Sequence, residues 1–413
     1  MRYRKNAQSN PPFNFEFMKI LMITPYLPFP LVSGGQIRTY NLLKNLAAKH
    51  KITLASFIRD PSEKKYLKNL EIFCDKVIIF KRRRAWSPLN ILLSGITPFP
   101  FLVSIYFDMG VRKKIKEELE KEKYDLIHAE TFYVMPNIPE TKVPIFLVEQ
   151  VIEYLVYQRF IEGLPIWVLP MKPLLQLDVL KIKWWEKYYW KKSKRLAAMS
   201  KEDKRFIEKS DPNLKVDVIA NGVDIEFFEK TQKQTLKNPT VLFVGNFKWL
   251  PNRDATKFLI EEIWPKIKTN IKNVRLWIVG RNPPEDILKY SSVDINIDSK
   301  VEDIRQAYGK SSVLVAPIRN GRGTKYKILE AMATKTPIVG TRLAIEGLNI
   351  KNEKEALIGS NSENLSKQTI RILKDNKLGT NLAQRAYQLV KDQYDWKKIS
   401  QELDRVYKEV GAI

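Results

Sequence analysis

Short apolar runs separated by helical stretches constrain the fold of this 413-residue chain more than any other feature. Each run is too short for a buried helix but long enough for a strand that is covered on both faces of a parallel sheet. Strands that alternate with helices in this way predict an α/β fold with doubly wound parallel sheets. The runs lie at residues 19–24, 52–57, 77–80, 126–128, 145–148, 195–200, 216–219, 241–244, 276–280, 313–316 and 338–339.

The length of the chain predicts two such domains, because a single hydrophobic core usually stops growing at roughly 250–300 residues. Residues 1–17 are basic, rich in Asn and Pro, and lack the apolar segment of a signal peptide, so we expect a disordered extension or a natural start at Met18. The expected parts are a Rossmann-like N-terminal domain at 18–228, a polar linker at 229–238, a Rossmann-like C-terminal domain at 239–394 and a final amphipathic helix at 395–413.

Charge and cysteine content narrow the classes of partner. The chain has 71 Lys and Arg against 46 Asp and Glu, a formal net charge of +25, which favours nucleic acid, membrane surfaces or phosphorylated substrates. Cys74 is the single cysteine, so an internal disulfide and a thiolate metal site are excluded and a reducing compartment is favoured. With His50 and His128 as the two histidines, we expect no bound metal.

The clearest chemistry lies in residues 313–341, where two apolar runs flank a loop and a helix. Gly321 and Gly323 make the loop flexible. Thr324 is the expected N-cap of a helix that runs to about residue 334. In such a strand-loop-helix unit the backbone can approach a phosphate closely, so all three residues are candidate ligand contacts.

Cations gather where this helix is expected to begin. Arg322, Lys325 and Lys327 oppose the helix dipole, so we expect an anion such as a phosphate or diphosphate between them. Glu330 lies one turn after Lys327 on the same face, where a carboxylate can accept hydrogen bonds from sugar hydroxyls. A solvated ion pair between Lys327 and Glu330 is the alternative, and the residues alone leave both interpretations open.

This stretch resembles the nucleotide-sugar signature of retaining glycosyltransferases of the family-four type, the glycosyl transferases group 1. More narrowly, it is similar to a bacterial branch with the pattern G-G-G-T-R-x-K-x-L-E-A-M-A. The resemblance implies a GT-B architecture, in which two Rossmann-like domains face a cleft and the last helix crosses back onto the first domain. The matching residues are Gly321, Gly323, Thr324, Lys325, Lys327, Ile328, Leu329, Glu330, Ala331, Met332, Ala333, Pro337, Ile338 and Val339.

The resemblance also implies roles. Glu330 would hold the ribose of the donor, a nucleoside diphosphate sugar such as a UDP- or GDP-sugar, and the preceding basic residues would hold its diphosphate. Lys325 is a catalytic candidate because a fixed cation stabilises the charge that develops on the leaving diphosphate. These cations would replace a metal, so we expect no cofactor. Two departures are visible: Arg322 stands where the wider family has a second glutamate, and Lys325 stands where the branch has arginine.

Two further glycine loops are candidate donor contacts. Gly34 and Gly35 lie between the first apolar run and a predicted helix at 36–49; a simple turn is the alternative to a phosphate contact, which the resemblance implies. Gly245 follows the run at 241–244, and the wider family has phosphate-binding cations shortly after this glycine. Lys248 is therefore the candidate cation in this chain.

His128 and Glu130 are candidate catalytic residues, because ligands of doubly wound sheets bind at the carboxyl ends of the strands. A histidine at such a place can equally be a hydrogen-bonded core residue. Gln150 stands where relatives have the histidine of an E-H-N-x-E-Y-like segment, which weakens an acid-base role there.

Two segments raise the question of a membrane. Residues 87–107 carry no charge, but prolines and polar residues interrupt them, so we expect core or an acceptor-side surface. Residues 154–195 interleave tryptophans with lysines, and residues 81–84 are all basic. This pattern favours peripheral contact with an anionic membrane at its cytoplasmic face, against the alternative of a solvated basic surface.

The resemblance therefore implies a retaining, metal-independent hexosyltransferase that uses a glycan, lipid-linked or cell-surface polysaccharide acceptor, and we expect it to be cytoplasmic. Arg322 and Gln150 favour one alternative, a catalytically inactive family member that binds a ligand or serves as a scaffold. A nucleotide-sugar 2-epimerase on the same fold is another. Nucleic-acid binding is not expected, because the cations are spread along the chain rather than gathered in a recognised RNA-binding module.

Overall fold

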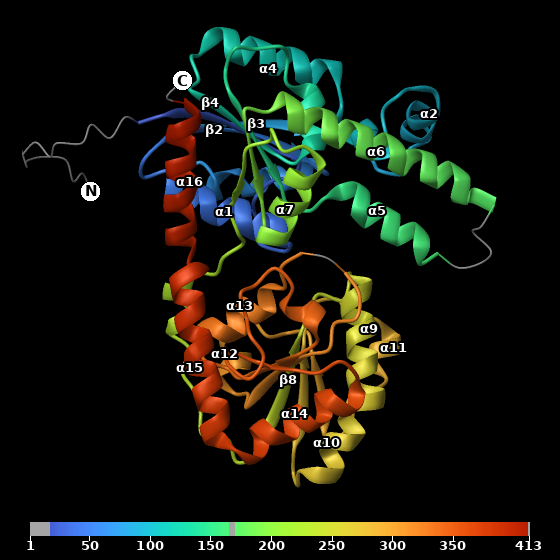
Figure 1. Ribbon diagram of the computed structural model, residues 1–413, viewed down its shortest axis with the longest axis vertical. Coiled ribbons are helices and arrows are strands. Elements are labelled where there is room, and N and C mark those ends of the chain that lie inside the picture. Colours follow the sequence, from blue (N-terminus) through green and yellow to red (C-terminus); the bar gives the residue numbers. More distant parts are fainter. Residues whose placement is uncertain (1–16, 165–169, 322, 412–413) are drawn as a thin grey trace, which may run out of the picture.

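The computed structural model describes residues 17–164, 170–321 and 323–411. Within these residues the chain forms two α/β domains, each built on one parallel sheet with helices on its faces (Figure 1). The predicted fold class is confirmed. The predictions made for Arg322 and for residues 1–16 of the N-terminal extension lie outside the described residues.

The first domain contains a seven-stranded sheet with the order β3-β2-β1-β4-β5-β6-β7. Every strand pair in it is parallel, and the order reverses between β1 and β4, the position at which doubly wound sheets bind ligands. The strands are β1 (Lys19–Thr24), β2 (Lys51–Ile58), β3 (Lys76–Lys81), β4 (Leu126–Glu130), β5 (Ile145–Glu149), β6 (Arg195–Ala198) and β7 (Val216–Val218).

Several helices of the first domain begin at capping residues that the sequence supplies. Ser33, Asp108 and Ser200 each accept a hydrogen bond from the first turn of the helix that follows, which satisfies an otherwise unpaired N–H group. The helices are α1 (Gly34–Leu46), η1 (Pro61–Asn69), α2 (Pro88–Ile96), α3 (Phe101–Tyr106), α4 (Met109–Lys121), η2 (Phe132–Asn137), α5 (Glu153–Glu162), α6 (Lys172–Lys192) and α7 (Lys201–Ser210).

The second domain contains a six-stranded sheet with the order β10-β9-β8-β11-β12-β13, again parallel, with its reversal between β8 and β11. The strands are β8 (Thr240–Val244), β9 (Arg275–Val279), β10 (Ile295–Asp298), β11 (Val313–Ala316), β12 (Ile338–Gly340) and β13 (Leu357–Ile358). The helices after β7 are α8 (Ile225–Glu229), α9 (Leu250–Phe258), η4 (Leu259–Ile263), α10 (Trp264–Asn270), α11 (Glu285–Leu288), α12 (Ile304–Gly309), α13 (Tyr326–Ala333), η5 (Arg342–Ile345), α14 (Ser362–Lys374), α15 (Asn376–Gln393) and α16 (Trp396–Gly411).

Helix α16 crosses back onto the first domain, as the predicted architecture requires (Figure 1). Its buried Leu403 and Tyr407 belong to the same hydrophobic cluster as β1 and α1 of that domain. Where the chain returns, the backbone N–H of Val223 donates to Tyr394 O at 2.8 Å and that of Trp396 donates to Val223 O at 3.3 Å. The two crossings of the chain between the domains therefore lie side by side.

The segment between the domains packs on the second domain. Ile225 and Phe228, which we expected to end the first domain, lie in the hydrophobic core of the second. In the expected linker, the Lys233 amine donates to Thr336 Oγ1 at 2.6 Å and the Gln234 N–H donates to Gly309 O at 3.0 Å. The second domain thus begins at about residue 223.

The uncharged residues 87–107 fold as α2 and α3 with a break between them. Val103 and Ile105 of α3 are buried in the core, while most of α2 is exposed. Among the described residues, no helix combines the length and the apolar character that a bilayer span requires.

Candidate functional site

Helix α13 begins at Tyr326, one residue later than a helix capped by Thr324 would. Lys325 occupies the N-cap position, and its side chain makes no capping hydrogen bond. Thr324, the predicted cap, instead accepts a hydrogen bond from the Asn221 amide at 3.3 Å, so that prediction was wrong. The first N–H groups of a helix have no partner within the helix and are available to a ligand at this end.

Lys327 is a buried cation, with an exposed fraction of 9%. Its amine donates to Asn252 Oδ1 at 2.9 Å and lies 4.3 Å from the centre of the Phe243 ring. Glu330 is the carboxylate whose charge acts on this amine. Burial lowers the pKa of Lys327 to about 7, against the influence of Glu330. The alternative of a solvated ion pair with Glu330 therefore does not describe this lysine.

Glu330 is held by a residue that the sequence did not point to. The Tyr308 hydroxyl donates to Glu330 Oε2 at 2.7 Å and lies 3.2 Å from Lys327 O. Burial raises the pKa of Glu330, opposed by this hydrogen bond and by Lys327. Because Tyr308 lies in α12, 22 residues earlier, no spacing rule could have connected it with the carboxylate.

The loop before α13 requires its glycines. Gly321 has φ +99° and Gly323 has φ +81°, a backbone region that side-chain-bearing residues rarely adopt. The Lys325 amine donates to Gly323 O at 2.6 Å. Burial lowers the pKa of Lys325, and Glu346 opposes the shift. The loop thus turns tightly beside two lysines, as a phosphate site would need.

The loop between β8 and α9 lies beside the same helix start. The Asn252 side chain donates to Asn246 O at 2.8 Å while it accepts from Lys327, so one residue fixes both the loop and the lysine. A Cβ atom on Gly245 would lie 3.0 Å from Asn252 Cγ, which leaves little room for a larger residue. Lys248 is exposed at the edge of this loop. Sequence reasoning missed Asn252.

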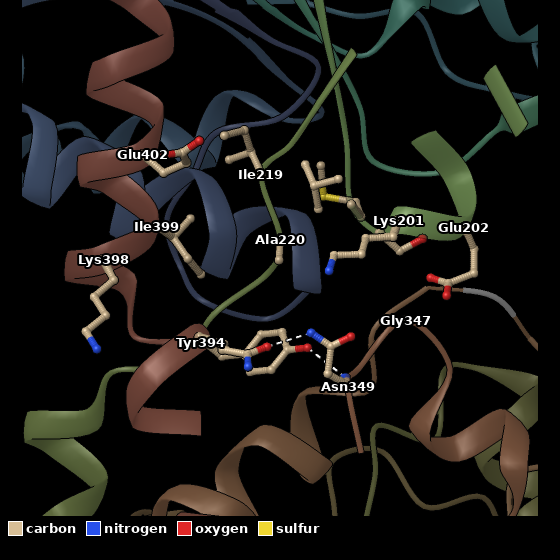
Figure 2. A pocket seen from close by; sticks show the side chains of 14 residues that line it. Lys201, Glu202, Ile219, Ala220, Gly347, Asn349, Tyr394, Lys398, Ile399 and Glu402 are labelled. Atoms are coloured by element: carbon tan, nitrogen blue, oxygen red, sulfur yellow. Dashed lines mark hydrogen bonds between the residues drawn. The ribbon is translucent and has the colours of Figure 1, made fainter. Parts of the chain in front are cut away.

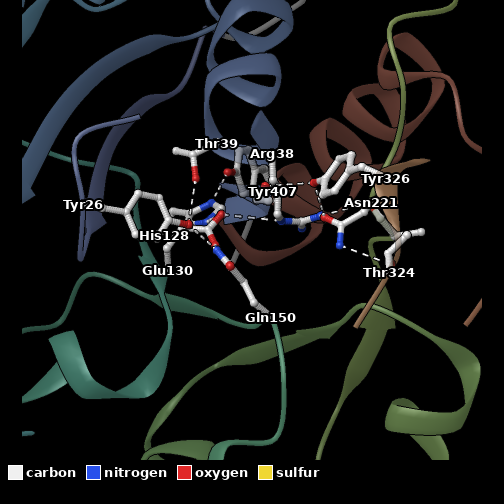
Figure 3. A network of polar contacts seen from close by, with 12 residues as sticks. Tyr26, Arg38, Thr39, His128, Glu130, Gln150, Asn221, Thr324, Tyr326 and Tyr407 are labelled. Atoms are coloured by element: carbon white, nitrogen blue, oxygen red, sulfur yellow. Dashed lines mark hydrogen bonds and ion pairs between the residues drawn. The ribbon is translucent and has the colours of Figure 1, made fainter. Parts of the chain in front are cut away.

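The first domain approaches α13 through the predicted glycine loop (Figure 3). The Tyr326 hydroxyl donates to Gly34 O at 2.9 Å and lies 3.2 Å from Asn221 Oδ1. A Cβ atom on Gly34 would lie 2.9 Å from the Tyr326 ring, and one on Gly35 would collide with the Tyr26 hydroxyl. Both glycines therefore allow a close approach, and the start of α1 faces the start of α13.

His128 and Glu130 are both fully buried (Figure 3). The ring nitrogens of His128 contact the Tyr407 hydroxyl and Glu130 Oε1, the second at 3.1 Å. Glu130 also accepts from the Gln150 amide at 2.7 Å and lies 3.8 Å from Arg38. Although burial acts to raise it, His128 and Arg38 hold the pKa of Glu130 below its usual value.

This arrangement is that of a hydrogen-bonded core network, the alternative that the sequence left open for His128. Neither His128 nor Glu130 reaches a surface that a substrate could touch, so the structure does not support their predicted catalytic role. Gln150 connects the network to the cleft, because it also lines a cavity between the domains. The network can therefore position the cleft wall without taking part in chemistry.

Two cavities mark the space between the domains. The smaller, about 60 Å³, lies between Gln150 and Ser200 of the first domain and Thr324 and Gly347 of the second. The larger, about 290 Å³, extends from Ser200 and Gly347 to the chain crossing at Tyr394, whose hydroxyl accepts from the Asn349 N–H at 2.8 Å (Figure 2). Ligand sites usually measure about 300–1,000 Å³, so a ligand of that size would fit here only if the domains moved apart.

The described residues of this region do not form a set of ligands for a metal ion. Within residues 17–164, 170–321 and 323–411, no group of three His, Cys, Asp or Glu side chains could hold a metal ion. The charges that face the start of α13 are instead the amines of Lys325 and Lys327. This end of the second domain is therefore suited to an anion.

Comparison with known proteins agrees with this geometry. The family model described as Glycosyltransferase Family 4 matches residues 32–227, and the model described as Glycosyl transferases group 1 matches residues 238–375. The chain is 22% identical over 397 residues to an uncharacterised 44.6 kDa protein of the cps region of Klebsiella pneumoniae, which covers 92% of this chain and 97% of that protein.

Two solved structures share the whole fold. The crystal structure of a glycosyltransferase from Rickettsia africae superposes with a TM-score of 0.67 at 17% identity, over 96% of this chain and 99% of the other. The structure of HepE from Anabaena in complex with UDP and glucose superposes with a TM-score of 0.63 at 15% identity, over 95% and 100%. At these identities the likeness establishes the fold of two facing Rossmann-like domains.

Proposed function

Because the chain belongs to the GT-B glycosyltransferases, we propose that it transfers a hexose from a nucleoside diphosphate sugar, with UDP or GDP as the nucleotide. The acceptor is a glycan, a lipid-linked sugar or a cell-surface polysaccharide. The reaction retains the configuration of the anomeric carbon and uses no metal. The binding of UDP by a neighbour in fold, HepE, supports this choice of donor class.

The observation that carries the proposal is the buried Lys327 at the start of α13. A desolvated cation is costly unless something anionic accompanies it. Its hydrogen-bond partner is the neutral Asn252, and the charge of Glu330 offsets only part of the cost of burying the amine. A diphosphate at the helix N-terminus would supply that charge and would also accept hydrogen bonds from the free N–H groups.

The remaining residues complete a donor site. Glu330, oriented by Tyr308, accepts the ribose hydroxyls. Lys325 and Lys327 hold the diphosphate from the side of the second domain, and the start of α1 at Gly34 faces it from the first. As the bond to the sugar breaks, negative charge grows on the diphosphate, and these fixed cations and N–H dipoles stabilise it without reorganising.

Calorimetric titration of UDP, GDP and ADP tests the proposal, with wild type beside Glu330→Ala. We expect one diphosphate to bind selectively and the variant to lose about 1.5–3 kcal/mol, the worth of hydrogen bonds to a charged group. Glu363→Ala is the matched control, because Glu363 is an exposed carboxylate of the same domain, on α14. If all three nucleotides bind with equal affinity and Glu330→Ala does not change that affinity, the proposed donor site is wrong.

Incubation with a nucleotide sugar but no acceptor distinguishes a transferase from an inactive family member and from a 2-epimerase. A transferase hydrolyses its donor slowly in the absence of acceptor, and an inactive family member leaves it intact. A 2-epimerase would convert the donor sugar to its epimer with no acceptor present, which NMR of the recovered nucleotide sugar would detect.

A further inference from the structure

Helix α2 exposes nearly all of its apolar side chains. Asn90 is its one buried residue, and it donates to Arg84 O rather than packing in the core. Ile91 and Leu92 are each more than half exposed, and Ile96 is 72% exposed. A helix with so little buried surface gains almost nothing from the core of its own domain. Its sequence is therefore suited to contact with something outside the chain.

Helix α6 is apolar on two opposite faces. Ile182 and Trp190 are buried against the first domain. Leu177, Leu180 and Trp184 lie on the other side, with exposed fractions of 50%, 60% and 58%. A surface helix normally carries polar residues on its outer face. The outer apolar stripe of α6 thus repeats the feature seen in α2.

The end of helix α2 contacts helix α6. The Lys181 amine of α6 donates to Ser94 O at 2.6 Å and to Thr97 O at 2.9 Å, at the end of α2. Trp185 Nε1 donates to Pro98 O at 2.9 Å. Figure 1 shows α2 and α6 projecting together from the same side of the first domain. We call the exposed face of these two helices the apolar ridge.

The charge beside the apolar ridge is basic. Lys183 and Lys187 follow the outer stripe along α6, whereas Lys191 further along is paired with Asp211 Oδ2 at 3.4 Å. The two acidic residues of this helix are directed elsewhere: Glu186 is fully buried and accepts from the Glu153 and Tyr154 N–H groups, and Asp178 accepts from the Phe101 N–H. Once Lys181 and Lys191 are set aside as engaged, the charge that α6 leaves for an outside partner is still positive, at Lys183 and Lys187.

We propose that the apolar ridge docks this protein onto the surface of an anionic lipid bilayer. Leu177, Leu180 and the helix α2 enter the boundary between headgroups and acyl chains, and the lysines of α6 contact lipid phosphates. Trp184 has an amphipathic ring that suits this boundary. A second copy of the chain is a poorer occupant, because pairing two such ridges would bring their lysines together.

Docking through this ridge would also place the cleft beside the bilayer. Helix α5 begins three residues after Gln150, which lines the smaller interdomain cavity, and α5 packs along α6. A lipid-linked acceptor would then lie within reach of the bound donor. This last step rests on the proposed transferase function, whereas the docking itself does not.

Sedimentation with lipid vesicles tests the docking. The probes are vesicles of phosphatidylglycerol with phosphatidylcholine, against phosphatidylcholine alone. We expect wild type to bind the anionic vesicles at least tenfold more tightly and to lose this preference in high salt. The triple variant Leu177→Gln/Leu180→Gln/Trp184→Gln should lose at least tenfold in affinity. Val293→Gln, at a fully exposed apolar residue of the second domain, should not.

Several results would overturn the docking proposal. The first is that wild type does not bind anionic vesicles, and the second is that the triple variant binds them as tightly as wild type. The third is that light scattering detects a dimer of wild type that the triple substitution dissociates, while vesicle binding is unchanged. Circular dichroism shows whether the variants are folded. UDP titration of the same samples separates the two proposals: a ridge variant that binds UDP normally but no vesicles supports docking, whatever the outcome for transfer.

Discussion

Replacing Lys327 with methionine should stabilise the protein and at the same time abolish binding of the donor. Lys327 is 9% exposed, and its pKa falls from the usual 10.5 to about 7. At about 1.4 kcal/mol per pKa unit, holding the proton in the folded state costs on the order of 5 kcal/mol below pH 7. Methionine has a similar length and carries no charge, so the variant avoids this cost.

The substitution also has a cost, which reduces the gain in the free energy of unfolding. The substitution leaves Asn252 Oδ1 without the Lys327 amine, which costs about 1–3 kcal/mol for a buried acceptor. The net gain is then about 3 kcal/mol at pH 6. The unfolded chain keeps the lysine proton up to pH 10.5, while the folded chain releases it near pH 7. Wild-type stability therefore rises with pH between these values, and the advantage of the variant shrinks to about zero near pH 9.

Urea unfolding of both proteins at pH 6, 7.5 and 9 measures this difference. Lys367→Met, at an exposed position of α14 in the same domain, is the control and should change stability by less than about 0.5 kcal/mol at every pH. A Lys327→Met protein that is less stable than wild type at pH 6, or a stability difference that does not change with pH, would refute the account of Lys327 as a desolvated cation.

Three further outcomes are expected. The affinity for UDP should be constant below pH 7 and fall up to tenfold per pH unit above it, because binding requires the Lys327 ammonium; calorimetry in buffers of different ionisation enthalpy should show proton uptake at pH 8. Tyr308→Phe should weaken UDP binding by about 1–2 kcal/mol but leave pyrophosphate binding unchanged, since the lost hydroxyl orients the ribose contact. Gly34→Ala should reduce kcat/KM, because its methyl group meets the Tyr326 ring, whereas Gly95→Ala, with open space around it, should have little effect.

Much of the fold could be predicted because most strands are local apolar runs; β10, with the sequence INID, and the two-residue β13 are not, and neither was predicted. The loop at residues 313–341 was also predictable in outline, since Gly321 and Gly323 adopt positive φ values that few other residues accept. The start of α13 was placed one residue early because Thr324 is a good cap by type, but its hydroxyl is engaged by Asn221 of another segment. At this position a tertiary contact outweighs the local preference of threonine for the N-cap.

The parts of the site that could not be predicted depend on contacts between distant segments. Asn252 and Tyr308 hold the side chains of Lys327 and Glu330 across 75 and 22 residues. His128 is buried because Tyr407 of the last helix, 279 residues later, contacts it. A sequence pattern predicts which residues share one face of a strand or helix. The contacts between distant residues form only when α12, α13 and α16 have packed in the folded protein.

The paired chain crossing at Val223 and Tyr394 limits how the protein can open. A single connection would let the domains twist, slide or swing, but two connections side by side leave rotation about one line as the motion that stretches neither. The cavity of about 290 Å³ beside Tyr394 gives this rotation room at its axis. The two halves of the phosphate site, carried by α1 and α13, would then separate along an arc. The gap would widen with distance from the axis, so a long ligand such as the proposed nucleotide sugar would enter from the side farthest from the axis.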